Sequence, residues 1–221
     1  MIDKKEWFSK LSEQLSSIFN SRLLFVGVQG SYRRGEARED SDIDAVVILD
    51  RVSLADLDAY RSLLSTLPES GKACGFCCGR EELLGWPRYE LFHLWKDTEP
   101  VLGDLKALLP PFGDDDVRDS VRIAAGNLYH LLCHSYLYAP ETDRRNLLKG
   151  AYKGVFFLLE EAYYLRTGDY PATKRELLDR LTGKEREILA LSMDWEGADS
   201  VGEQALYGQL LDLSSEILRS L

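Results

Sequence analysis

The residues of this sequence best suited to chemistry are a glycine–serine pair, Gly30-Ser31, and two aspartates, Asp42 and Asp44. The aspartates lie two positions apart at the start of an apolar run, and residues i and i+2 of a strand point to the same face. Two neighbouring carboxylates repel each other unless a cation lies between them. Carboxylate oxygens suit Mg²⁺, which completes its coordination with substrate phosphates. The pair therefore predicts a magnesium site.

The glycine–serine pair fits the same chemistry, because it directly follows another apolar run, residues 23–28. Glycine lets the backbone approach a ligand closely, and Ser31 could open a short helix whose free N–H groups favour an anion. A phosphate cradle opposite a metal-binding pair suits phosphoryl or nucleotidyl transfer. The alternative is a surface hairpin with an acidic turn, which would need neither the glycine–serine pair nor two aspartates on one face.

Gly-Ser, a spacer and then Asp-x-Asp between apolar residues resembles the signature of the polymerase-β-like nucleotidyltransferase superfamily. The matching residues here are Gly30, Ser31, Asp42 and Asp44. The resemblance implies ATP as co-substrate and Mg²⁺, for which we expect two ions held by Asp42 and Asp44. It also implies that Gly30 and Ser31 bind the β- and γ-phosphates.

The resemblance further implies a third carboxylate on a later strand. We interpret residues 88–95 as that strand and Glu90 as the carboxylate. Glu90 would accept the proton of the acceptor hydroxyl or share the second metal ion. Asp97 is the fallback candidate, with a simple turn as its alternative. An exposed glutamate on an edge strand is the alternative interpretation of Glu90.

Positive charge must balance a triphosphate, and candidates lie in two places. Arg33 and Arg34 directly follow the glycine–serine pair. Lys149 and Lys153 are i, i+4 neighbours on an expected helix. We expect Arg33, Lys149 and Lys153 to contact the nucleotide, the alternative being solvated loop and helix surfaces.

The expected fold class is α+β, with a small mixed-sheet nucleotidyltransferase domain over residues 1–110 and an all-α helical bundle over 111–221. The boundary lies at two adjacent prolines, which oppose helix on both sides of themselves. Glu160, on a long bundle helix, is our candidate for binding a cationic acceptor in a pocket between the domains. Further strands are expected at 23–29 and 72–79, with residues 98–112 as a loop. The expected bundle helices are 114–138, 144–166, 173–181, 184–192 and 201–221.

Composition and charge limit the classes of molecule that the protein is expected to bind. The formal net charge of −10 argues against a nucleic-acid polymer as substrate, because the protein would repel its phosphates. No apolar run is long enough to span a membrane. Residues 1–15 carry scattered charges unlike a secretory leader, so we expect a cytoplasmic protein with its cysteines as thiols. Cys74 and Cys77 would point to opposite faces of a strand, which favours small buried hydrophobes over zinc ligands.

The order of the two expected domains resembles the aminoglycoside adenylyltransferases and their lincosamide-modifying relatives, and segments 149–153 and 168–178 are similar to recurring parts of those bundles. The resemblance implies transfer of AMP from ATP to a hydroxyl of a small, cationic, aminoglycoside-like acceptor, with release of pyrophosphate. One alternative is an antitoxin-type AMP transferase that modifies a protein. Another is a catalytically silent nucleotide-binding module. A homodimer formed through the last helix is also left open.

Overall fold

A computed structural model describes residues 2–221 and, except for Asp199, their side chains. The chain divides into two compact units, Met1–Phe112 and Gly113–Leu221. The apolar cores of the two units are separate clusters, two around the sheet of the first and one within the helices of the second. The α+β fold class predicted from the sequence is confirmed.

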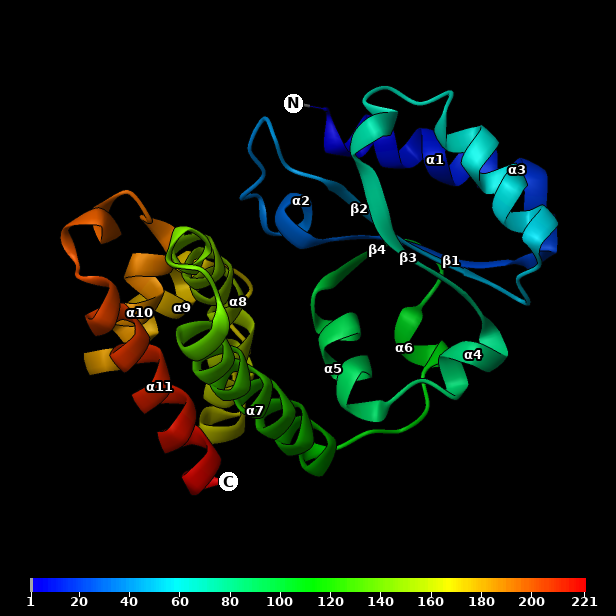
Figure 1. Cartoon of the computed structure of the whole chain (residues 1–221). Helices are drawn as coiled ribbons and strands as arrows, with labels where there is room; N and C mark the ends of the chain where they lie inside the picture. The colour runs from blue at the N-terminus through cyan, green and yellow to red at the C-terminus, as the bar shows by residue number, and fades with distance from the viewer. Residues whose placement is uncertain (1) are drawn as a thin grey trace. The chain divides into compact units, whose positions relative to one another are not determined.

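The first unit is a four-stranded mixed sheet with helices on both faces (Figure 1). The strand order is β3-β2-β1-β4, with β2 parallel to β3 and all other neighbours antiparallel. The elements in chain order are α1 (Lys4–Phe19), η1 (Asn20–Arg22), β1 (Leu23–Gln29), α2 (Gly30–Arg34), β2 (Ile43–Leu49), α3 (Leu54–Leu64), η2 (Ser70–Lys72), β3 (Ala73–Gly79), α4 (Arg80–Leu84), α5 (Arg88–Lys96), β4 (Thr98–Leu102) and α6 (Leu105–Leu108).

Alternation along the strands sends side chains into two different cores. Ile43, Ala45 and Val47 of β2 pack in the cluster that contains the apolar stripe of α1. Val46 and Ile48 pack in the other cluster, with residues of α4, α5 and α6. Figure 1 shows α1 and α3 over one face of the sheet and α4, α5 and α6 over the other. The face that Val46 and Ile48 share is therefore also the face of Asp44.

The prediction of a strand at 88–95 is wrong, because these residues form α5. Its apolar residues recur at three-residue steps and bury Leu91 and Leu94, which is a helical period. The expected loop at 98–112 is also wrong, since it contains β4 and α6. The strand expected at 72–79 is present as β3, but at the edge of the sheet and with Cys74 exposed.

The second unit is helical, as predicted. Its core joins side chains from its five α-helices, and two buried tyrosines of that core donate hydrogen bonds: Tyr152 to Gln209 Oε1 (2.8 Å) and Tyr207 to Ser135 Oγ (3.0 Å). None of the described helices is both long enough and apolar enough to cross a membrane. The elements are α7 (Asp114–Tyr138), α8 (Glu141–Thr167), α9 (Lys174–Arg180), α10 (Gly183–Met193), η3 (Gly197–Ser200) and α11 (Glu203–Ser220).

Candidate active site at the end of the sheet

The paired aspartates lie where β1 ends and β2 begins. Gln29, the last residue of β1, pairs with Asp44 in the antiparallel register. Asp42 precedes β2 directly and is exposed, whereas Asp44 is half-buried. Ile43 lies in the opposite core, so the expected alternation of the two carboxylates with apolar neighbours is present.

Gly30 brings the backbone against one of these carboxylates. Its φ of +69° is a left-handed conformation that side chains disfavour, and a Cβ at this position would lie 2.3 Å from Asp44 Oδ2. Gly30 opens the short helix α2, which Ser31 continues as the motif predicted. Only glycine fits here, because any side chain would displace the Asp44 carboxylate.

The two arginines of α2 are held by Asp97, which lies between α5 and β4. Arg34 Nη1 donates to both carboxylate oxygens of Asp97, at 2.9 and 2.8 Å, and its Nε donates to Glu36 at 3.2 Å. Arg33 Nη2 donates to the Lys96 carbonyl at 2.9 Å, and its Nη1 lies 3.6 Å from Asp97 Oδ1. Burial opposes the charge of Arg34, but the carboxylates of Asp97 and Glu36 outweigh it and raise its pKa.

Asp97, the fallback candidate for the third carboxylate, belongs to this network, and so does His93, which the sequence reasoning did not identify. Asp97 follows α5 and is only 2% exposed. Burial lowers the pKa of the nearby His93, opposed by the charge of Asp97 and assisted by Arg34 and Arg33. The available signal was the pair of arginines after Gly-Ser, since two adjacent cations beside a buried strand need a counter-ion.

The carboxylate pair fits Mg²⁺ by its chemistry. Two hard oxygen ligands on one face of a strand are the protein share that Mg²⁺ takes when phosphates complete its shell. Among the described residues, no group of three or more His, Cys, Asp or Glu side chains could hold a metal ion. The protein would therefore supply Asp42 and Asp44, and the substrate would supply the remaining ligands.

The structure does not bring Glu90 to this site. Glu90 is exposed in the first turn of α5, where its Oε2 accepts a hydrogen bond from Trp86 Nε1 at 2.7 Å. Asp97, which contacts Gly30, follows the opposite end of that helix, and at 1.5 Å per residue about 10 Å of helix separates them. The role of Glu90 as proton acceptor stays a prediction, without the strand that motivated it. On β3, Cys74 is the partner of Asp44, and that strand contains no carboxylate.

The remaining candidates belong to α8 of the second unit. Lys149 and Lys153 are exposed on this helix. Glu160 is fully buried, and its Oε2 accepts a hydrogen bond from the Tyr170 hydroxyl at 2.8 Å. The neighbouring Glu161 is also buried, and desolvation raises its pKa to about 7, against a smaller opposing effect of a hydrogen bond with Ser120.

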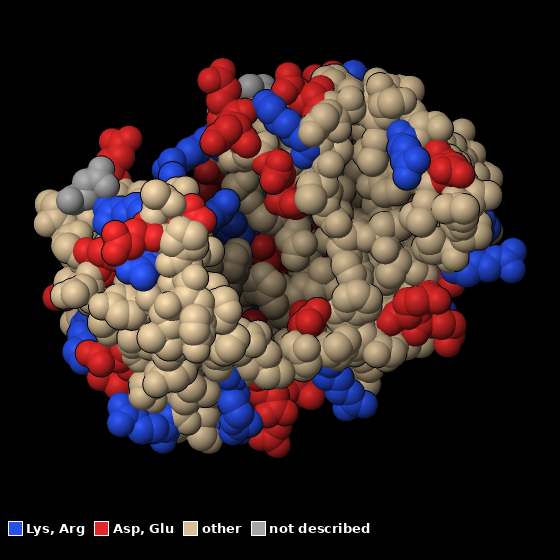
Figure 2. All heavy atoms as spheres, in the orientation of Figure 1, with Lys and Arg blue, Asp and Glu red and all other residues tan. Residues whose placement is uncertain are grey.

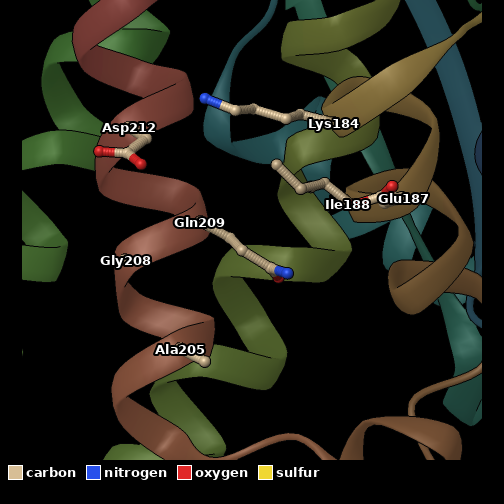
Figure 3. A pocket seen from close by; sticks show the side chains of 7 residues that line it. All are labelled: Lys184, Glu187, Ile188, Ala205, Gly208, Gln209 and Asp212. Atoms are coloured by element: carbon tan, nitrogen blue, oxygen red, sulfur yellow. The ribbon is translucent and has the colours of Figure 1, made fainter.

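A cavity of about 380 Å³ lies within the second unit, between α10 and α11 (Figure 3). None of the predicted site residues lines it. Its walls are formed by Lys184, Glu187, Ile188, Ala205, Gly208, Gln209 and Asp212. Across the face seen in Figure 2, acidic and basic side chains of the described residues are intermixed, and they form no continuous basic tract there.

Comparison with known proteins decides the class. Residues 8–73, which contain Gly30, Ser31, Asp42 and Asp44, match the family model of the nucleotidyltransferase domain. This segment of the chain is therefore similar to a nucleotidyltransferase domain. The predicted resemblance to this superfamily is thereby confirmed, and with it the expectation of an enzyme of this class. No curated protein gives a significant match to the sequence.

The fold of this chain is shared over nearly its whole length with a solved structure. It is similar to the crystal structure of spectinomycin adenyltransferase AAD(9) from Enterococcus faecialis with ATP and spectinomycin, at a TM-score of 0.62 and 14% identity. The similarity covers 97% of this chain and 99% of that one. The combination of a sheet unit with a helical unit is therefore the shared architecture.

Proposed function

We propose that this protein transfers AMP from Mg²⁺-bound ATP to a hydroxyl of a small cationic acceptor, releasing pyrophosphate. The observation that carries the proposal is the close approach of Gly30 to Asp44, because it means that a short helix begins beside the carboxylate that we propose as a Mg²⁺ ligand. The nucleotidyltransferase family match and the fold shared with an adenyltransferase support it.

In this proposal Asp42 and Asp44 hold Mg²⁺, and Gly30 and Ser31 bind the β- and γ-phosphates through N–H groups and the serine hydroxyl. Bound Mg²⁺ supplies charge neutralisation of the triphosphate and of the oxygens that enter and leave the α-phosphate. Arg33, the more loosely held arginine of α2, supplies additional positive charge to the phosphates. The acceptor hydroxyl oxygen attacks the α-phosphorus and gives up its proton to water, and the bond to the β-phosphate oxygen breaks to release pyrophosphate.

We infer the class of acceptor from the net charge of this chain and from its structural similarity to an adenyltransferase. The net charge of −10 favours a cationic ligand over an anionic one. Lys149 and Lys153 of α8 are the proposed second-unit contacts for the nucleotide. Glu160 is fully buried against Tyr170, so its contact with the acceptor stays a prediction. An aminoglycoside-like amine is the corresponding substrate class.

The test is pyrophosphate release from Mg²⁺-ATP in the presence of a panel of aminoglycosides, spectinomycin and lincosamides. We expect release with at least one of them and none without Mg²⁺. Release with no member of the panel would contradict a small antibiotic-like acceptor. A protein substrate would then be the better candidate.

A matched pair of variants tests the site. Asp42→Asn should lower kcat/KM by at least about a hundredfold, because a neutral amide holds Mg²⁺ poorly. Asp42 is exposed, so its melting temperature should stay close to that of the wild type. The control is Asp40→Asn, the same change at an exposed position of the preceding loop, which should retain full activity. Retained activity in Asp42→Asn would refute the assignment.

A further inference from the structure

Gly30 lies between two carboxylates, one on strand β2 and one directly before strand β4. On its Cα side is Asp44, whose Oδ2 leaves no room for a Cβ. On its N–H side is Asp97, whose Oδ2 accepts the Gly30 N–H at 3.3 Å. The sheet explains this convergence, because Gln29 of β1 pairs with Asp44 on one side and with Thr98 of β4 on the other. Asp97 directly precedes Thr98.

The contacts of Asp97 with the two arginines of α2 differ in distance and in burial. Arg34 is gripped through both carboxylate oxygens, and the side chains of this pair are 7% and 3% exposed. Arg33 lies at the longer distance of 3.6 Å and is 16% exposed. A buried, charge-assisted contact in which one nitrogen reaches both carboxylate oxygens is strong, whereas a longer contact at a more accessible side chain is easier to exchange. Arg34 is therefore a structural cation, and Arg33 is the cation of α2 that a ligand could recruit.

The oxygens of Asp97 are already used by this network. Oδ1 accepts from Arg34, and Oδ2 accepts from Arg34 and Gly30. Because both oxygens accept these hydrogen bonds, we do not assign Asp97 as a ligand of the metal ion. The hydrogen bonds connect it instead to the backbone of the phosphate-binding turn and to both ends of α2.

We propose that Asp97 is a positioning residue for the triphosphate, which acts by fixing the Gly30–Arg34 turn through the Gly30 N–H and Arg34 and by holding Arg33 beside the phosphate site. The inference rests on the proposed nucleotide-binding function. Asp97 itself touches neither nucleotide nor metal. Its contribution is to present the turn ready-formed, so that binding does not have to order it.

The experiment measures binding of Mg²⁺-ATP and of Mg²⁺-pyrophosphate by titration calorimetry, without acceptor. Asp97→Asn keeps the shape and one oxygen but removes the charge that holds Arg34. We expect its Kd to rise about tenfold or more for both ligands, since a charge-assisted contact is lost and the turn faces phosphates rather than the adenosine. A loss confined to Mg²⁺-ATP would contradict action through the turn.

The matched control is Glu36→Gln, which removes the other carboxylate partner of Arg34 but no contact to Gly30. It should bind both ligands within about twofold of the wild type. If Asp97→Asn does not fold, the double variant Asp97→Asn/Arg34→Gln removes both charges of the buried pair. The same weakening relative to Glu36→Gln is then expected of it.

The outcomes separate the two proposals. Wild-type Kd values in Asp97→Asn, with only a lower melting temperature, would show a purely structural role and overturn the positioning role. The proposed function would survive that result. Absence of Mg²⁺-ATP binding by the wild-type protein would overturn both.

Discussion

Both units of this protein bury carboxylates, but they stabilise them in different ways. In the first unit, Asp97 is paired with the guanidinium of Arg34, whose Nη1 donates to both carboxylate oxygens. In the second unit, Glu160 and Glu161 of α8 are buried, with hydroxyl groups among their partners: Tyr170 for Glu160 and Ser120 for Glu161. The buried acid of the sheet unit is thus part of an ion pair, whereas burial raises the pKa of Glu161 to about 7.

The two arrangements should respond differently to mutation and to pH. An ion pair taken out of water is costly to break, because the remaining partner keeps a buried charge. A carboxylic acid held by a hydroxyl can instead take up a proton, so its cost depends on pH. The sheet unit should therefore be sensitive to loss of a partner, and the helical unit to alkali.

The largest expected effect is on the ion pair. Arg34→Met removes the hydrogen-bonded partner of Asp97 and should lower the free energy of unfolding by about 3–5 kcal/mol, measured by urea denaturation. The control is Arg118→Met, which removes an exposed i, i+3 pair with Asp115 and should change stability by about 0.5 kcal/mol or less. Equal losses in the two variants would remove the contrast between buried and exposed pairs.

The next effect concerns Glu161. Its pKa is raised from 4.5 to about 7, so below about pH 4.5 both states hold the proton. As the pH rises through this window the unfolded chain loses the proton first, and the free energy of unfolding falls. We expect Glu161→Gln to remove this dependence of stability on pH. Above pH 7, the free energy of unfolding of the variant should be higher than that of the wild type by up to about 3 kcal/mol.

Urea denaturation from pH 4.5 to 8 measures the Glu161 effect. Glu187→Gln, at an exposed position of α10, is the control and should keep the slope of the wild type. A wild-type stability that rises with pH across the window, with Glu161→Gln parallel to it, would contradict the assignment.

A smaller effect is expected in the reactivity of two thiols of β3, Cys74 and Cys78. Burial raises the pKa of Cys78 to about 12, with contributions from Cys77 and Glu82, whereas Cys74 is exposed and pairs with Asp44. Iodoacetamide at pH 8 should therefore label Cys74 first, since the thiolate is the reactive form. The modified protein should bind Mg²⁺-ATP several-fold more weakly, and the Cys74→Ser variant should be protected from this loss. Mass spectrometry that finds Cys78 labelled first would refute the expectation.

The smallest expected effect is on the free energy of unfolding, for a substitution in the cavity between α10 and α11. Gly208 is within α11, and a Cβ there would have no atom within 4 Å. Gly208→Ala should raise the free energy of unfolding by about 0.5–1 kcal/mol, because alanine loses less backbone entropy in a helix. Mg²⁺-ATP binding should be unchanged, since the cavity holds none of the proposed site residues. Weaker nucleotide binding in this variant would assign the cavity a role in the site.

The sequence predicted the sheet strands that alternate or run apolar, but not β4. Pro100 argues against a strand, because proline cannot donate to a ladder, and it is tolerated here because β4 is an edge strand. The segment before it was misassigned for the opposite reason. Its aromatic and apolar residues favour a strand by propensity, whereas their three-residue recurrence fits the helix that forms.

The motif located the carboxylate pair and its glycine, because their spacing along the chain sets their positions on two adjacent strands. The role of Asp97 could not be predicted in the same way. Its contacts with Gly30 and Arg34 span 67 and 63 positions, and they depend on the pairing of β4 with β1. A local pattern does not specify a long-range strand pairing, and therefore not the partner of Arg34 either.

The separate apolar cores have a consequence for calorimetry. A single compact unit melts in one cooperative transition, but two units with separate apolar cores within one chain allow two heat-absorption peaks. Arg34→Met would then move only the peak of the sheet unit, and Glu161→Gln only that of the bundle. A single melting temperature would blend these responses, so the heat-capacity trace is the measurement in which each half of the chain can be followed by itself.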